Sequence, residues 1–100
     1  MKACLTKWIP PRADFVNTTT DTERDLLQQH SDWLNAMMAD GLIVAHGPVM
    51  DPAGSYGVAL WRIGDDQILS AVLAQDPIVR AGAGVGHYEQ FPMMHVSARG

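Results

Sequence analysis

The chain has 100 residues, of which 47% are hydrophobic and 18% charged, and its formal net charge is −4 at pH 7. This length suits one domain over residues 1–100 whose core is stable without disulfides or metals. The hydrophobic content excludes disorder, and the apolar runs are far shorter than the roughly 18 residues of a membrane span, so we expect no membrane partner. Charges of both signs are interspersed without a basic stripe, which argues against nucleic acid as a partner.

The amino-terminal residues bear on the cellular compartment. The apolar stretch after Met1 is too short to serve as a signal peptide, and a single cysteine cannot form an intramolecular disulfide. Both observations favour a cytoplasmic location. That residue, Cys4, has no adjacent histidine or clustered cations, so nothing indicates a reactive thiolate.

The first half of the chain predicts a strand and a long helix. The strand covers Ala3–Ile9 and is stopped by two prolines. The helix spans about Asp21–Ala39, because Thr20 and Glu23 have capping-box spacing and apolar residues recur at steps of three and four. These apolar positions are Leu26, Leu27, Trp33, Leu34, Met37 and Met38. His30 falls inside this apolar stripe.

The second half predicts a hairpin and a second helix. Two β-rich runs, residues 42–50 and 56–62, are separated by a turn-forming segment and indicate an antiparallel pair. The second helix is predicted to begin at the cap Asp65 and to end before Pro77, because a residue that precedes proline disfavours helical angles. Asp76 is therefore expected at the carboxyl-terminal boundary of this helix.

A last strand over residues 85–96 completes the order β-α-β-β-α-β. This is the α+β, ferredoxin-like arrangement, in which two helices cover one face of an antiparallel sheet and leave the other open. In the second strand Leu42 and Val44 alternate with Ile43 and Ala45, so both sides of the strand are apolar. We therefore expect burial on both sides, with a second copy packed sheet to sheet in a homodimer through the open sheet face.

His30 and Asp76 are the leading candidates for a functional pair. A carboxylate bound to one nitrogen of a neutral histidine fixes the tautomer and raises the basicity of the other nitrogen. Such a general base accelerates proton transfer by about 10²–10⁴. In the alternative interpretation, His30 binds a backbone carbonyl and Asp76 caps a turn before Pro77. Composition and spacing alone favour this structural alternative.

Several segments together resemble the YCII-related domain family. They are a histidine in the first helix, His46-Gly47-Pro48, a third strand containing Gly57, and Gln75-Asp76-Pro77-Ile78-Val79 followed by Ala81-Gly82. The resemblance covers about Arg24 to Pro92, and its most specific part is the Asp-Pro motif with the following Ala-Gly pair and the upstream histidine.

What the resemblance implies is a dimeric α+β barrel whose proposed active histidine and aspartate correspond to His30 and Asp76. Few activities are assigned in the family, one being dehydrochlorination of a small ring compound. The resemblance makes a functional pair the preferred interpretation. The segment between Pro10 and Thr20 is longer and richer in Pro and Thr than we expect for the family, which affects the pocket entrance.

His46 is a further candidate for contact with a substrate. It shares strand parity with Leu42 and Val44, so it could point into the same pocket, together with the adjoining Gly47 and Pro48. A lone strand histidine beside Gly-Pro is more often a turn or edge residue. Both interpretations remain open.

Trp33 lies about one helical turn from His30 and could stack on a planar substrate. An aromatic residue on an apolar helix stripe is more often part of the core, and we also expect Trp61 to be a core residue.

No cofactor is expected. The glycine-rich residues 81–86 precede a strand instead of opening a helix, so they match no nucleotide-binding fingerprint. The histidines, the cysteine and the acids show neither His-Glu-x-x-His nor paired Cys-x-x-Cys spacing, so no metal site is expected.

The leading hypothesis is a cofactor-independent lyase or isomerase acting on a small, cyclic, oxygenated metabolite as substrate. His30 would be the general acid or base and Asp76 its orienting partner. Three alternatives remain: a module that binds a small molecule without turnover, an interaction domain with a vestigial pocket, and a cofactor-free oxygenase of the related dimeric barrel class.

Overall fold

A computed structural model describes residues 1–82 and 84–99 of the chain, and its four strands form one sheet. The elements are β1 (Lys2–Ile9), α1 (Phe15–Thr18), α2 (Asp21–Ala39), β2 (Ile43–Val49), β3 (Tyr56–Ile63), α3 (Leu69–Leu73), α4 (Pro77–Arg80) and β4 (His87–Met93). The strand order is β2-β3-β1-β4, and each neighbouring pair is antiparallel. This topology confirms the predicted ferredoxin-like α+β fold.

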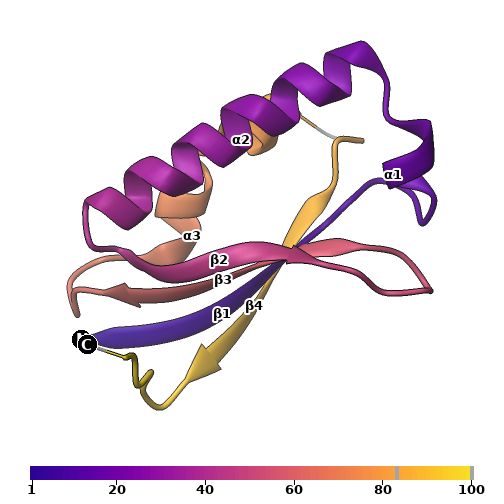
Figure 1. Cartoon of the computed structure of the whole chain (residues 1–100). Coiled ribbons are helices and arrows are strands. Elements are labelled where there is room, and N and C mark those ends of the chain that lie inside the picture. The colour runs from indigo at the N-terminus through magenta and orange to yellow at the C-terminus, as the bar shows by residue number, and fades with distance from the viewer. Residues whose placement is uncertain (83, 100) are drawn as a thin grey trace.

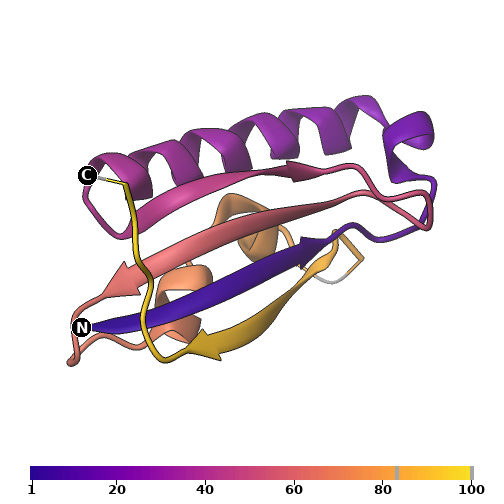
Figure 2. The same cartoon turned by 60° about the horizontal axis from the view of Figure 1, so that its bottom comes forward.

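The helices all lie on one face of the sheet, with α2 running along its length (Figure 1). The other face carries no helix, as the turned view shows (Figure 2). In that view the chain that follows β4 crosses this open face near the start of β1. No helix in the described part of the chain is both long and apolar enough to cross a membrane.

The predicted long helix is confirmed as α2, with the predicted bounds. Its capping box is complete, because the backbone amide of Glu23 donates to the Thr20 hydroxyl at 3.1 Å while the Thr20 amide donates to the Glu23 carboxylate at 2.9 Å. The short helix α1, which precedes α2, was not predicted. One turn carries too little periodicity to be recognised in a sequence.

The prediction of one continuous second helix that is capped by Asp65 was wrong. The chain instead forms α3, which begins after Ile68, and α4, which begins at Pro77 with Asp76 as its N-cap. Proline has no amide hydrogen to lose and its fixed φ suits the first position of a helix, so Pro77 starts a helix here, whereas α3 already ends at Leu73. Asp65 instead pairs with the terminal amine at 2.9 Å.

The last strand is shorter than the predicted residues 85–96, because β4 begins at His87 and ends at Met93. Gly86 precedes it with φ of +96°. A Cβ atom at this position would lie 2.5 Å from the carbonyl oxygen of Ile9. The close approach and the positive φ both require glycine, and together they fix the point at which the chain enters the sheet beside β1.

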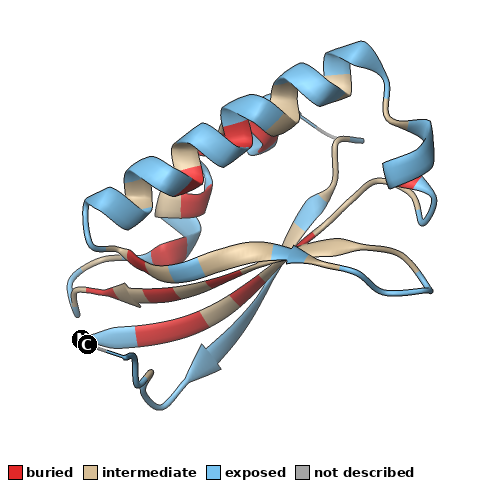
Figure 3. Ribbon diagram, in the orientation of Figure 1, coloured by how far each residue is buried: buried red, intermediate tan, exposed pale blue. Residues whose placement is uncertain are grey.

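Two clusters of buried side chains lie between the helices and the sheet. Figure 3 marks the buried positions in red along the ribbons of the helices and strands. The larger cluster consists of Cys4, Leu34, Ile43, Ala59, Trp61, Ile63, Leu69 and Leu73. The smaller one consists of Trp8, Phe15 and Ile78. Trp61 is fully buried, as expected of a core residue, and its indole nitrogen donates to the buried hydroxyl of Thr6 at 2.9 Å. The smaller cluster lies beside the candidate site.

Candidate functional site

His30 and Asp76, 46 residues apart in sequence, are in direct contact. His30 Nδ1 lies 2.6 Å from Asp76 Oδ2, and the two residues are 6% and 0% exposed. A carboxylate oxygen can only accept, so Nδ1 carries the hydrogen and Nε2 is the free ring nitrogen of the neutral tautomer. The alternative in which His30 binds a backbone carbonyl is therefore wrong, whereas Asp76 does cap the backbone that follows it.

The backbone at the start of α4 holds the Asp76 carboxylate in place. The amide of Ile78 donates to Asp76 Oδ1 at 2.9 Å, which is the N-cap interaction, and this leaves Oδ2 to face His30. The rigid Asp-Pro start of the helix thus fixes the carboxylate without a flexible loop. Because Asp76 is fully buried, its charge must be stabilised by hydrogen bonds within the protein, and the Ile78 amide and the His30 ring provide two of them.

Tyr88 is a third member of the cluster, and sequence reasoning missed it. Its hydroxyl donates to the same oxygen, Asp76 Oδ2, at 2.6 Å. Burial and this hydrogen bond to the carboxylate raise the pKa of Tyr88, so the hydroxyl stays protonated and keeps donating. Tyr88 pairs with Trp8 across β4 and β1, and that pairing brings it to the site. The sequence gives no local signal of this strand pairing.

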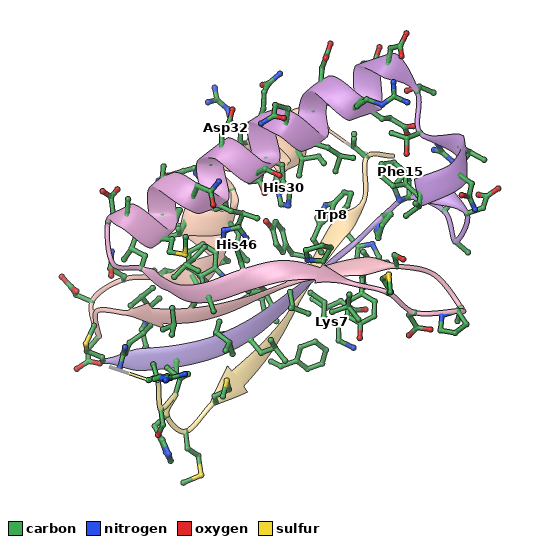
Figure 4. All side chains as sticks on the ribbon, in the orientation of Figure 1. Lys7, Trp8, Phe15, His30, Asp32 and His46 are labelled. Carbon is green, nitrogen blue, oxygen red and sulfur yellow. The ribbon has the colours of Figure 1, made fainter. Side chains whose placement is uncertain are left out.

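A cavity of about 370 Å³ adjoins His30 on the helix side of the sheet. Trp8 packs on the histidine, with ring centroids 5.3 Å apart, and Phe15 meets Trp8 edge to face at 5.9 Å. Figure 4 shows His30, Trp8 and Phe15 on the same side of the sheet, below α2. His30 Nε2 has no hydrogen-bond partner among the described residues, so it is available to a molecule in the cavity.

His46, Gly47 and Pro48 all line the cavity. The predicted parity of His46 was wrong, because a bulge between Ile43 and Ala45 shifts the register of β2. Ile43 and His46 therefore both face the helices, although their positions differ by three, an odd number that would place them on opposite faces of a regular strand. His46 Nε2 lies 2.8 Å from the side-chain oxygen of Asn35 on α2, which holds the ring at the edge of the cavity.

Trp33 does not line the cavity. It packs against the larger core cluster, with its ring centroid 5.9 Å from that of Trp61. The structural alternative thus describes Trp33 better than the substrate-stacking hypothesis, and the aromatic ring beside His30 is that of Trp8. Trp8 is the seventh residue of β1. Nothing in the sequence of this strand indicates that Trp8 lies close to a histidine on a helix.

The segment between β1 and α2 forms one rim of the cavity. Phe15 is buried and Val16 is 66% exposed, and both line the cavity. Arg12 fastens this segment to α2, because its guanidinium donates to both oxygens of Glu23, at 2.8 and 2.7 Å, and to the Thr18 hydroxyl at 2.7 Å. The Pro- and Thr-rich stretch that departs from the expected family pattern is therefore part of the entrance.

The charges and ligand types at the site define what it can do chemically. No group of three or more His, Cys, Asp or Glu side chains in the described part of the chain could hold a metal ion. The cluster supplies a histidine with one free nitrogen, a buried carboxylate behind it and a permanent hydroxyl donor. This arrangement can accept a proton, hold it and return it.

Comparison with known proteins places the chain in a family. The model of the YCII-related domain matches residues 3–96. A search of curated proteins gives no match. The family match covers nearly the whole chain, and it confirms the resemblance seen in the Asp-Pro motif and the upstream histidine. The chain belongs to the YCII-related domain family.

Proposed function

We propose that this member of the YCII-related domain family is a cofactor-independent enzyme that transfers a proton on a small, cyclic, oxygenated metabolite. The observation that carries the proposal is the 2.6 Å contact between His30 Nδ1 and the buried Asp76 carboxylate, beside a cavity that His30 lines. The carboxylate favours the protonated ring, so it strengthens Nε2 as a base.

The reaction class that fits is an elimination or an isomerisation. His30 Nε2 takes a proton from a carbon next to a carbonyl group, and the electron pair of the broken C–H bond forms an enolate. In an elimination this electron pair then forms a C=C bond while a leaving group departs with its own pair from the neighbouring carbon. In an isomerisation the protonated His30 returns the proton to a different carbon. Asp76 stabilises the charged ring in both cases.

Exchange of carbon-bound hydrogen with solvent deuterium tests the proposal without knowledge of the natural substrate. Cyclic ketones and lactones are incubated with the protein in deuterated buffer, and deuterium incorporation and loss of leaving groups are followed by NMR. We expect catalysed exchange for some of these compounds, with a loss of about 10²–10⁴ in rate for His30→Gln. Asp76→Asn, which keeps an N-cap acceptor for Ile78, is expected to lose about tenfold or more.

His87→Gln is the matched control, because His87 lies on β4 and is exposed. It should leave the exchange rate unchanged. Wild-type protein that exchanges none of the compounds, or His30→Gln that exchanges them as fast as wild type, would contradict the proposal. Binding that persists in His30→Gln without any exchange in wild type would favour a binding module instead.

We also propose that the protein is a homodimer through the open sheet face. Three residues in register on neighbouring strands, Leu60, Leu5 and Phe91, form an apolar row on that face. Phe91 is 43% and Met93 37% exposed. An apolar row on a sheet face without helices supports packing against a second copy, because the same row is then buried on both copies across a twofold axis.

A further inference from the structure

The cavity next to His30 has walls of aromatic, aliphatic and small uncharged polar residues. None of the described residues that line it is a lysine, an arginine, an aspartate or a glutamate. The ring of Trp8 lies beside the imidazole of His30 at a tilt of 39°, and Phe15 meets Trp8 at 74°. Ring faces in an apolar cavity of about 370 Å³ suit a flat molecule of one or two rings.

Two cations from neighbouring segments are engaged elsewhere. The guanidinium of Arg12 is occupied by both oxygens of Glu23 and by Thr18. Lys7 extends from the opposite face of β1, as Figure 4 shows, where its ammonium lies 4.8 Å from the ring centroid of Tyr56 and 5.6 Å from that of Phe91. Neither cation is placed to neutralise an anion beside His30.

The buried Asp76 charge adds to this effect. With a neutral His30 ring the pair carries one negative charge, and with a protonated ring it carries none. Neither state gives the cavity a net positive charge. A carboxylate or phosphate that entered would lose its hydration without gaining a counter-ion, which is a strongly unfavourable transfer.

We propose that the cavity selects a planar, uncharged ring compound that carries a hydroxyl or carbonyl group and excludes carboxylates and phosphates. The inference rests on the proposed function only in that His30 Nε2 is the group that meets the hydroxyl or carbonyl. The side chains of Ser31, Ser55 and His46 line the same cavity and offer further polar contacts. The two serines carry no charge, and His46 carries none in its neutral form.

A pair of probes that share one ring system separates the two charge classes. We choose 2-naphthol, which is uncharged at neutral pH, and 2-naphthoate, which is an anion. The indole N–H signals of the three tryptophans report on location, because Trp8 lines the cavity while Trp33 and Trp61 belong to the larger cluster. We expect 2-naphthol to shift the Trp8 signal, and to bind tighter than 2-naphthoate by about tenfold or more.

A cation placed on the rim should narrow this preference. Val16 lines the cavity and is 66% exposed, so a longer polar side chain is tolerated there. Val16→Lys is expected to tighten 2-naphthoate binding by about threefold to tenfold without a similar gain for 2-naphthol. Val16→Gln, which has a similar length and no charge, is the matched control and should not change the preference.

Each outcome of the binding experiment either supports or overturns the charge selectivity. Tighter binding of 2-naphthol at Trp8, with a narrower preference in Val16→Lys but not in Val16→Gln, supports the inference. Equal or tighter binding of 2-naphthoate to wild type, or no Trp8 shift with either probe, overturns it. The proposed function is tested separately. If the protein prefers 2-naphthol but catalyses no deuterium exchange, the charge selectivity stands and only the proposed proton transfer is contradicted.

Discussion

One oxygen of Asp76 accepts two hydrogen bonds of 2.6 Å, one from His30 Nδ1 and one from the Tyr88 hydroxyl. Two donors on one oxygen divide the charge of the carboxylate between them. The more of that charge Tyr88 stabilises, the less is available to hold a proton on His30. Tyr88, which also lines the cavity, is therefore expected to adjust how strongly the carboxylate acts on His30.

Replacement of Tyr88 by Phe tests this division of charge. We expect the NMR signal of the His30 Nδ1 proton to move downfield in Tyr88→Phe, because the full carboxylate charge then acts on that hydrogen bond. The free energy of unfolding should fall by about 1.5–3 kcal/mol, the usual contribution of a hydrogen bond to a charged group.

Tyr56→Phe is the matched control, since the chain has only two tyrosines and the Tyr56 ring lies beside Lys7. It should leave the signal of the His30 Nδ1 proton unchanged. A signal that is unchanged or moves upfield in Tyr88→Phe would show that Tyr88 only fills space or stiffens the site.

His30 and Asp76 were predictable because each departs from its local pattern. A histidine in an apolar helix stripe and an aspartate before proline are visible in the sequence, and the family resemblance connected them. Tyr88 and Trp8 were not predictable in this way. Both are residues that strands commonly contain, and their place at the site depends on the register between β1 and β4, which is a long-range property.

At the scale of elements, the ion pair between Arg12 and Glu23 joins the cavity rim to the start of α2. Hydrogen bonds from Arg12, and the backbone hydrogen bond from Thr20, lower the pKa of Glu23 to about 2. This folded-state value lies below that of an unfolded chain, about 4.3. The resulting stabilisation is therefore present above pH 4.3 or so and is lost as the pH falls through about 2.

Glu23→Gln removes this charge and keeps an acceptor for the Thr20 amide, so it tests the ion pair without destroying the capping box. We expect its thermal midpoint to lie a few degrees below that of wild type at pH 6, and the difference to narrow as the pH is lowered toward 2. Asp21→Asn is the control in the same helical turn, because the Asp21 side chain is fully exposed and contacts Arg24 only. A difference that stays constant with pH would contradict the role of the Glu23 charge.

The helices show where local patterns suffice and where they fail. The capping box and the apolar stripe predicted α2 correctly, because both signals act within a few residues. The prediction treated Pro77 as the end of a helix, whereas α3 ends at Leu73 and Pro77 begins α4, a position that also suits proline. A bulge in β2, which only the pairing with β3 reveals, decided which way His46 faces.

The whole molecule presents two different faces, and the open one carries the remaining prediction. The helix face is filled by the two core clusters, whereas on the other face the row Leu60, Leu5 and Phe91 lies without a covering helix (Figure 2). The ferredoxin-like order was predictable from element order alone. Whether another chain covers the open face was not predictable with the same certainty. The one sign of such burial in the sequence is that both sides of a strand are apolar.

Light scattering after size exclusion tests the dimer directly. We expect wild type to elute at twice the 10.9 kDa mass of the chain. Phe91→Lys places a charge in the apolar row and should raise the dissociation constant by about 100-fold or more, because an unpaired charge would be buried at the centre of the interface.

Met50→Lys is the matched control, since Met50 is 92% exposed and lies in the turn after β2, away from that row. It should remain dimeric. A wild-type chain that elutes at 10.9 kDa at high concentration would contradict the dimer. Deuterium exchange and probe binding by that monomer would then show that the His30 cavity is complete within one chain.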